Sequence, residues 1–256
     1  MRYRPRLSAF AVPAVLLGLL VALCIANERV APALGLLFPG EARMVFGQAT
    51  MLELLQDHLG MVAVSSVLSV LIGLALGVFV TRPAGADFFD VIADLANFGQ
   101  TFPPIAVFVL AVPILGFGFS PTVLALTLYG VLPVLFNTIA GIRSLPANVL
   151  ESAAGMGMRP WQVLWRVELP LAAPVILAGV RVSVVINVST ATLGAIAGAG
   201  GFGAAIVSGL ANQDPAVTLQ GAVLASLLAL GLDGLVTAVG TAWAPRVLAI
   251  SDERAG

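Results

Sequence analysis

The sequence contains no lysine, one cysteine and one histidine among its 256 residues. Without lysine the chain cannot form a G-x-x-x-x-G-K-[ST] phosphate loop, a Schiff base or a Ser-Lys dyad. The single cysteine, Cys24, excludes an intrachain disulfide and a cysteine-rich metal site. We therefore do not expect an enzyme with an active site of its own, and any ATP hydrolysis that serves this chain must take place on another chain.

Charged residues are also scarce, at 10% of the chain, and the net charge of −1 offers no basic face for nucleic acid. By contrast, 59% of the residues are hydrophobic, and the mean hydropathy of +1.05 is far above that of a soluble domain. The composition therefore predicts an all-α membrane protein that crosses the bilayer several times.

Long stretches without charged residues give the number of spans, because a helix needs about 20 largely apolar residues to cross a core of roughly 30 Å. The uncharged run from Leu95 to Ile142 is long enough for two helices, broken by the turn from Gly116 to Pro121. In all, six spans are predicted: Leu7 to Ala26, Leu59 to Val80, two within Leu95 to Ile142, about Leu171 to Ala195, and about Val217 to Trp243.

Arginine, which supplies all twelve basic residues, sets the expected orientation, because positive charge is retained on the cytoplasmic side of short loops. An even number of spans places both termini on one side. With that side cytoplasmic, only Arg29 and Arg43 lie in external segments. The cytoplasmic segments then hold Arg2, Arg4, Arg6, Arg82, Arg143, Arg159, Arg166, Arg246 and Arg254.

The first hydrophobic stretch has two interpretations. Its arginine-rich start and the small residues Ala22 and Ala26 fit a cleaved signal peptide, but its length fits a span and the rest of the chain is membrane-embedded. We favour a retained helix. The chain then divides into a first helix with its external connection (1–58), a transmembrane core (59–243) and a cytoplasmic tail (244–256).

Two connections have helical character. In the external connection, Ala42 to His58 is compatible with a short surface helix, and we expect His58 to be an interfacial residue just before a span rather than a metal ligand. In the inner loop from Arg82 to Asp94, three aspartates at helical spacing predict an amphipathic turn that lies on the membrane surface.

The loop from Arg143 to Pro170 is the only long polar interruption between the late spans, and it is longer than a chain reversal needs. Small residues from Ser152 to Gly157 favour a helix that can fit closely against a partner. Glu151, near the start of this helix, is placed to pair with a partner's arginine. We expect Pro160 to end the helix. A second, amphipathic piece follows, with Trp161, Val163, Leu164 and Val167.

Residues 151–170 read ESAAGMGMRPWQVLWRVELP and resemble the EAA loop of ABC-importer permeases, whose pattern is E-A-A-x(3)-G-x(9)-I-x-L-P. Ser152 and Val167 depart from the pattern in side-chain identity. The resemblance implies a coupling helix that contacts separate ATPase subunits, which hold ATP and magnesium. The residues expected to contribute to coupling are Glu151, Ser152, Ala153, Gly157, Leu169 and Pro170.

Three further segments, Gln100 to Pro104, Asn187 to Leu193 and Gly198 to Gly203, resemble permeases of osmoprotectant importers, which carry glycine betaine, choline, carnitine or proline-type solutes. Permeases for methionine and other small solutes share much of this framework. The resemblance covers roughly Leu59 to Trp243 and implies a second permease copy or a paralogue, an external solute-binding protein and the bacterial inner membrane.

Polar residues within the spans are candidates for the pathway, because such residues usually face the bundle interior or a water-filled cavity. Asp233 and Arg181 are expected to lie in the inner halves of the sixth and fifth spans, where they can pair. Ser and Thr in a span often serve only as contacts between helices. The pathway candidates are Gln100, Thr101, Asn137, Asn187, Thr190 and Asp233.

The segment from Gly198 to Gly203 matches the G-x-G-x-x-G dinucleotide fingerprint, but it follows a membrane helix instead of a strand. We interpret the segment as a bend at the outer mouth of the pathway, with Gly198, Gly200, Gly201 and Gly203 as candidates for an outer gate.

A quaternary ammonium solute is usually recognised by an aromatic cage, yet the chain has only three Trp and two Tyr. High-affinity selection is therefore expected on the binding protein. The alternative function is a proton- or sodium-driven secondary transporter that uses Asp233 and Arg181. A third possibility is a membrane scaffold without transport activity.

Overall fold

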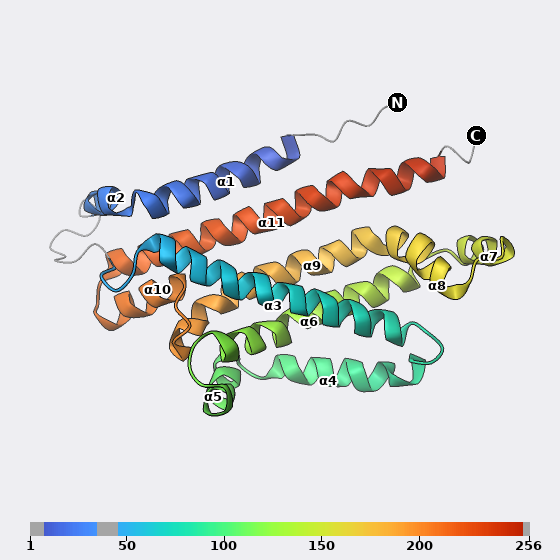
Figure 1. Cartoon of the computed structure of the whole chain (residues 1–256), viewed down its shortest axis with the longest axis horizontal. Helices are drawn as coiled ribbons and strands as arrows, with labels where there is room; N and C mark the ends of the chain where they lie inside the picture. Colours follow the sequence, from blue (N-terminus) through green and yellow to red (C-terminus); the bar gives the residue numbers. More distant parts are fainter. Residues whose placement is uncertain (1–7, 35–45, 253–256) are drawn as a thin grey trace.

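The computed structural model describes residues 8–34 and 46–252, and every regular element in these ranges is helical (Figure 1). The predicted all-α fold is therefore confirmed. The α-helices are α1 (Ser8–Ile25), α2 (Asn27–Leu34), α3 (Met51–Val80), α4 (Phe89–Thr101), α5 (Pro104–Leu115), α6 (Phe119–Arg143), α7 (Ala147–Gly155), α8 (Pro160–Val163), α9 (Leu169–Ala191), α10 (Phe202–Ala211) and α11 (Pro215–Asp252). Two 3₁₀-helices, Ala86–Phe88 and Thr192–Ala197, and a π-helix, Leu164–Glu168, complete the described elements.

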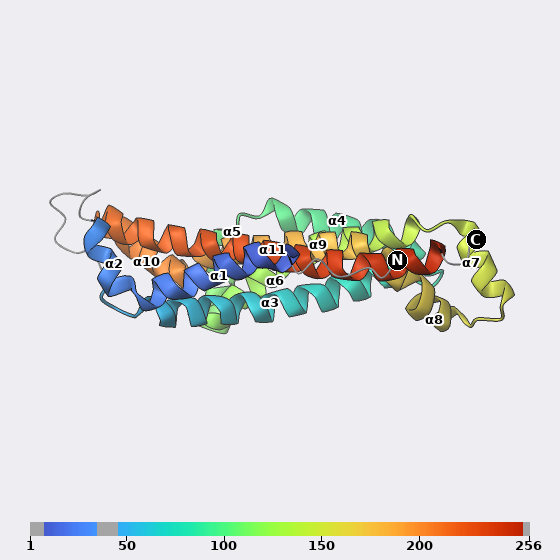
Figure 2. The ribbon, with the colours of Figure 1, turned by 90° about the horizontal axis from the view of Figure 1, so that it is seen from above.

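Helices α3, α6 and α9 pack together at the centre of the bundle (Figures 1 and 2). In lipid, helices associate through close packing and hydrogen bonds, because the lipid tails are as apolar as leucine. At Gly130 of α6, a Cβ would lie 2.8 Å from the hydroxyl of Ser183 on α9 and would also press on the hydroxyl of Ser69 on α3. Ser69 donates a hydrogen bond to the Thr127 carbonyl of α6 at 3.2 Å. Small and hydroxyl side chains therefore let the three helices approach closely.

Helices α1 and α11 pair on one side of this core, and α4 and α5 lie on the other (Figure 1). Leu17 of α1 fits against Gly231 of α11, where a Cβ would lie 2.8 Å from the Leu17 Cγ atom. Leu20 and Cys24 of α1 are buried in the main hydrophobic core. The retention of this first helix stays a prediction.

The two ends of the bundle carry different elements. In both views, α7 and α8 lie at the same end as the C-terminal part of α11, and α2 and α10 lie at the opposite end (Figures 1 and 2). This arrangement agrees with the predicted topology, in which the loop 143–170 and the C-terminus share one side of the membrane.

Within the described residues, four helical segments are long and apolar enough to cross a membrane: Met51–Val80, Phe119–Arg143, Pro160–Ala197 and Pro215–Ala242. The bent pair formed by residues 86–99 and 104–115 gives a fifth crossing if it is one span, and α1 is a shorter apolar helix. In chain order, these segments correspond to the six predicted spans.

The third predicted span differs from expectation because it is not one straight helix. Its two parts, 86–99 and 104–115, are bent by 94°. Phe102 and Pro103 are extended between them, with ψ of 132° and 139°. Pro103 and Pro104 cause the break, because proline lacks an amide hydrogen and disfavours helical geometry in the residue before it. The Tyr129 hydroxyl of α6 donates a hydrogen bond to the Phe102 carbonyl, which satisfies part of the broken backbone.

The outer connection also differs from expectation. Residues 42–45 lie outside the described residues, and 46–50 are not helical. Helix α3 begins at Met51 because Thr50 caps it: the Thr50 hydroxyl accepts from the Glu53 amide at 3.2 Å, and the Glu53 carboxylate accepts from the Thr50 amide at 2.8 Å. The predicted second span is therefore eight residues too short at its start, and the boundary expected at residue 58 lies inside α3.

Three helices extend or add to the predicted ones. The amphipathic turn expected in the inner loop is the start of α4, which continues to Thr101. Helix α10, Phe202–Ala211, was not predicted, because its ten residues are too few for a span and follow a glycine-rich turn. Helix α11 continues to Asp252, so most of the expected tail 244–256 is helical.

Candidate functional site

The loop expected to dock a partner forms α7, which projects from one end of the bundle (Figures 1 and 2). Glu151 and Ser152 are exposed on α7, whereas Ala153 is buried. Nearby on the loop, Trp161 and Trp165 leave 56% and 63% of their surface exposed. Aromatic side chains are enriched on surfaces that bind another protein.

The end of α7 corrects one prediction. The helix ends at Gly155, and Gly157 takes a left-handed φ of 78°. The Gly157 amide donates to the Ala154 carbonyl at 2.9 Å and the Met158 amide to the Ala153 carbonyl at 3.2 Å, which is a C-terminal cap. Pro160 therefore does not end this helix. Instead it begins α8, where a missing amide hydrogen has no cost.

The π-helix Leu164–Glu168 connects α8 to α9, and Leu169 and Pro170 begin α9. The Leu169 amide donates to the Leu164 carbonyl, one residue further back than in an α-helix. Wide turns of this kind are rare and are frequently found at functional sites. Leu169 and Pro170 are half-buried, so they belong to the base of the loop and not to its exposed surface.

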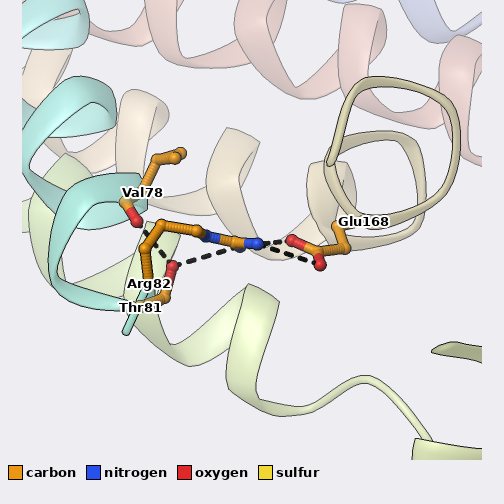
Figure 3. A network of polar contacts seen from close by, with 4 residues as sticks. All are labelled: Val78, Thr81, Arg82 and Glu168. Carbon is orange, nitrogen blue, oxygen red and sulfur yellow. Dashed lines mark hydrogen bonds and ion pairs between the residues drawn. The ribbon is translucent and has the colours of Figure 1, made fainter. Parts of the chain in front are cut away.

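An ion pair that was not predicted joins this loop to α3. Figure 3 shows the guanidinium of Arg82, just beyond α3, pointing at the carboxylate of Glu168. The Arg82 Nη1 atom donates to the Glu168 Oε1 atom at 3.1 Å, and Nη2 donates to Oε2. Nη2 also donates to the Thr81 hydroxyl at 3.3 Å, and that hydroxyl donates to the Val78 carbonyl at 2.7 Å. The sequence offers one signal for this pair, because a carboxylate directly before a span needs a partner.

The glycine segment lies at the opposite end of the bundle and packs on α3. Gly198, Gly200 and Gly201 have φ of 76°, 75° and 68°, the left-handed region that favours glycine. A Cβ at Gly200 would lie 2.6 Å from the Asp57 Oδ2 atom. A Cβ at Gly203 would overlap the carbonyl of Thr192, which precedes the turn. The segment is a tight, closely packed turn, and its role as an outer gate stays a prediction.

His58 is fully buried, so the expectation of an interfacial residue before a span is wrong. Its Nε2 atom lies 3.1 Å from the Val188 carbonyl of α9, and its Nδ1 atom accepts from the Phe202 amide of α10 at 3.3 Å. A carbonyl can only accept and an amide can only donate, so the neutral ring with its proton on Nε2 satisfies both partners. His58 therefore ties α3 to α9 and α10.

Two pathway candidates on α9, Asn187 and Thr190, are buried within the chain. The Asn187 amide fits an orientation in which its nitrogen donates to the Leu126 carbonyl at 2.8 Å and its oxygen accepts from the Ser66 hydroxyl at 3.1 Å. Asn187 thus connects α9 to α6 and α3. This position favours a role in helix packing over a role on an open surface.

Arg181 and Asp233 form the expected ion pair between α9 and α11. The Arg181 Nη2 atom donates to Asp233 Oδ2 at 2.7 Å, and Nε donates to Oδ1. The side chains remain 47% and 26% exposed. Beside the pair, a groove of about 250 Å³ lies between the two helices, lined in part by Leu177 and Thr237.

The other pathway candidates lie on two different helices, α4 and α6. Thr101 is exposed at the end of α4, and its hydroxyl donates to the Phe98 carbonyl at 2.7 Å. Asn137 is half-buried on α6 and donates to the Pro133 carbonyl at 2.8 Å. The side chain of Gln100 lies outside the described residues. In the described part of the chain, the candidates are distributed over α4, α6, α9 and α11.

Comparisons with known proteins place this architecture in a family. Residues 69–247 match the family described as "Binding-protein-dependent transport system inner membrane component". The chain is 40% identical over 201 residues to the osmoprotectant import permease protein OsmY of Salmonella typhimurium, a match that covers 78% of this chain and 85% of that protein. It is 41% identical over 178 residues to the choline transport system permease protein OpuBB of Bacillus subtilis, covering 69% and 81%.

Among solved structures, a chain of the MetNI methionine ABC transporter in an inward-facing conformation is similar in fold. Its TM-score is 0.63 with 24% identity, over 76% of this chain and 93% of that chain. The family match covers more than half of the chain and agrees with the observed apolar helices. The chain therefore belongs to the binding-protein-dependent transport system inner membrane components, a family of membrane-spanning permeases.

Proposed function

We propose that this chain is the permease subunit of an ATP-driven importer for small osmoprotectant solutes such as glycine betaine or choline. The observation that carries the proposal is the projecting helix α7, which exposes Glu151 and Ser152 within the segment that resembles an EAA loop. The names of the relatives support the solute class, since OsmY is named for osmoprotectant import and OpuBB for choline transport.

In this proposal, the work is divided among several chains. Partner ATPase subunits bind ATP and magnesium and dock on α7 through the exposed residues Glu151 and Ser152 and the Gly157 turn. A second permease copy or a paralogue completes the pathway, and an external solute-binding protein delivers the solute. The aromatic content of only 7% supports selection on the binding protein, because a cage for a quaternary ammonium group needs several aromatic rings.

The proposed orientation places both termini and α7 in the cytoplasm, with the chain in the bacterial inner membrane. The arginine distribution supports it, because cytoplasmic loops retain positive charge. Closure of the ATPase subunits on ATP would then bring α7 and the equivalent helix of the second permease together. This movement would switch the pathway from inward to outward access. The solute-binding protein would release its solute into the outward-open pathway.

The test is to purify the chain gently from its native membrane, identify the proteins that accompany it, and reconstitute the complex with its binding protein. We expect an ATP-hydrolysing companion, and uptake of radiolabelled glycine betaine that requires ATP, stops with vanadate and persists with an uncoupler.

A proton- or sodium-driven transporter predicts the reverse, with uptake that collapses with the uncoupler and ignores vanadate. That result would overturn the proposal. The geometry already weighs against this alternative, because both carboxylate oxygens of Asp233 are held by Arg181 instead of being free to bind an ion.

A further inference from the structure

The ion pair between Arg82 and Glu168 connects the loop 143–170 to the end of α3 (Figure 3). Glu168 is the last residue of the coupling segment, defined here as residues 147–168, and Arg82 lies two residues beyond the end of α3. We propose that this pair is the joint through which displacement of the coupling segment moves α3. The inference rests on the proposed function and deepens it, because it names the positioning residues of the coupling step.

The pair is built into the structure and is not a surface contact. The Glu168 side chain is 8% exposed and that of Arg82 is 29% exposed. Two parallel N–H···O contacts fix the relative direction of the two groups. The Thr81 hydroxyl braces the guanidinium from the other side. The Arg82 Nε atom is buried without a partner, so the guanidinium is oriented toward Glu168 even at the expense of one donor.

The π-helix lies where the coupling segment meets α9. Pro170 cannot donate a backbone hydrogen bond to the preceding turn, and the wide turn Leu164–Glu168 lies there. The backbone connection from the coupling segment to α9 is therefore weakened at this point. From this same point, the ion pair connects the coupling segment to Arg82 at the end of α3. A displacement of the coupling segment is thus transmitted to α3 through Arg82, and to α9 along the backbone.

Helix α3 can carry this displacement to the other end of the bundle. Its 30 residues span about 45 Å as a single helix. Near the start of α3, Asp57 and His58 contact the glycine segment. His58 also accepts a hydrogen bond from the Phe202 amide at the start of α10. Helix α3 therefore connects two regions. The coupling segment contacts Arg82 just beyond one end of the helix, and the glycine turn contacts His58 near the other end.

A second charged contact at the same end serves as a comparison. The Arg143 guanidinium lies 4.4 Å from the ring centroid of Phe89. This cation–π contact joins α6 to α4 and does not involve the coupling segment. Of the two ion pairs among the described residues, only the pair of Arg82 and Glu168 ends on the coupling segment.

The first test reads movement at the glycine segment and does not depend on the transported solute. In a Cys24→Ala background, Ile196→Cys provides an exposed thiol on the 3₁₀-helix before the glycine turn. In the assembled complex with its ATPase subunits, we expect the rate of maleimide labelling at this thiol to change when ATP and vanadate are added. We expect that change to be lost with Arg82→Gln or Glu168→Gln.

The matched control is Arg143→Gln, which removes a positive charge at the same end of the bundle. Arg143 is exposed in the last turn of α6, lies outside the coupling segment, and has no ion pair within the described part of the chain. We expect this variant to label as the parent does, within about twofold. Arg82→Lys and the exchanged pair Arg82→Glu with Glu168→Arg keep opposite charges at the joint, so both should restore at least part of the ATP-dependent change.

The second readout is the amount of glycine betaine imported for each ATP hydrolysed. We expect Arg82→Gln to lower this ratio by about tenfold while ATP hydrolysis continues. If neutral variants fail to assemble with the ATPase, the exchanged pair decides, because it must assemble and restore both readouts. The joint is refuted if a neutral variant keeps the ATP-dependent labelling or if the parent shows no such change. It is also refuted if the exchanged pair fails to assemble or fails to recover that change. A parent that changes labelling with ATP but imports no betaine instead refutes the proposed solute.

Discussion

The buried His58 gives the most direct prediction about stability. In His58→Leu, the Val188 carbonyl and the Phe202 amide lose their side-chain partner, while the new side chain still fills most of the space. Leaving a buried polar group unsatisfied costs about 1–3 kcal/mol, so the two together are expected to cost about 3 kcal/mol or more. For a chain of this size, 1 kcal/mol corresponds to about 2–4 °C in melting temperature. The expected decrease is therefore about 6–12 °C.

The assay is thermal melting of the purified complex in detergent, and the quantity measured is the fraction of protein that stays soluble and monodisperse at each temperature. His58→Gln keeps one polar partner and should lose about half as much. Gln56→Leu is the matched control, because Gln56 is exposed on the same helix two residues earlier. It should shift melting by less than about 2 °C. If His58→Leu melts as the control does, the reasoning from the two hydrogen bonds is refuted.

Three further predictions concern other contacts. Gly203→Ala places a Cβ against the Thr192 carbonyl, so we expect it to cost about 1–3 kcal/mol and to lower both melting temperature and uptake; unchanged melting would contradict the close packing. Asp233→Asn leaves Arg181 unpaired in the bilayer, so adding Arg181→Gln should recover stability in a melting assay; if the losses of the two single variants simply add, the pair is not coupled. Glu151→Arg should release the ATPase subunits in a pull-down without changing the melting of the permease, and retention of the ATPase would exclude its role in docking.

The spans and the coupling loop could be predicted because both follow from local sequence. A membrane requires about 20 apolar residues for each crossing, so the charge-free runs marked the long helices α3, α6, α9 and α11 to within a few residues at most ends. The pairing of Arg181 with Asp233 was also predictable, since two opposite charges in one membrane need each other.

The errors arose where tertiary contacts override the local pattern. Hydropathy placed the start of the second span after His58, but the Thr50 cap starts the helix earlier, and α9 and α10 bury the ring. The span through Phe102 looked continuous in hydropathy, yet two prolines bend it by 94°. The ion pair of Arg82 and Glu168 joins residues 86 positions apart, and only the folded bundle shows that they meet.

The central claim is that α7 faces the cytoplasm and contacts an ATP-hydrolysing subunit. It is tested most directly by Ala154→Cys in a Cys24→Ala background, since Ala154 is exposed on α7, with Asn212→Cys at the opposite end of the bundle as the control. We predict that a thiol cross-linker joins residue 154 to the ATPase subunit, and that a membrane-impermeant maleimide applied to spheroplasts labels residue 212 but not residue 154. Labelling of residue 154 from outside, together with the absence of any cross-link to a nucleotide-hydrolysing chain, would contradict the account.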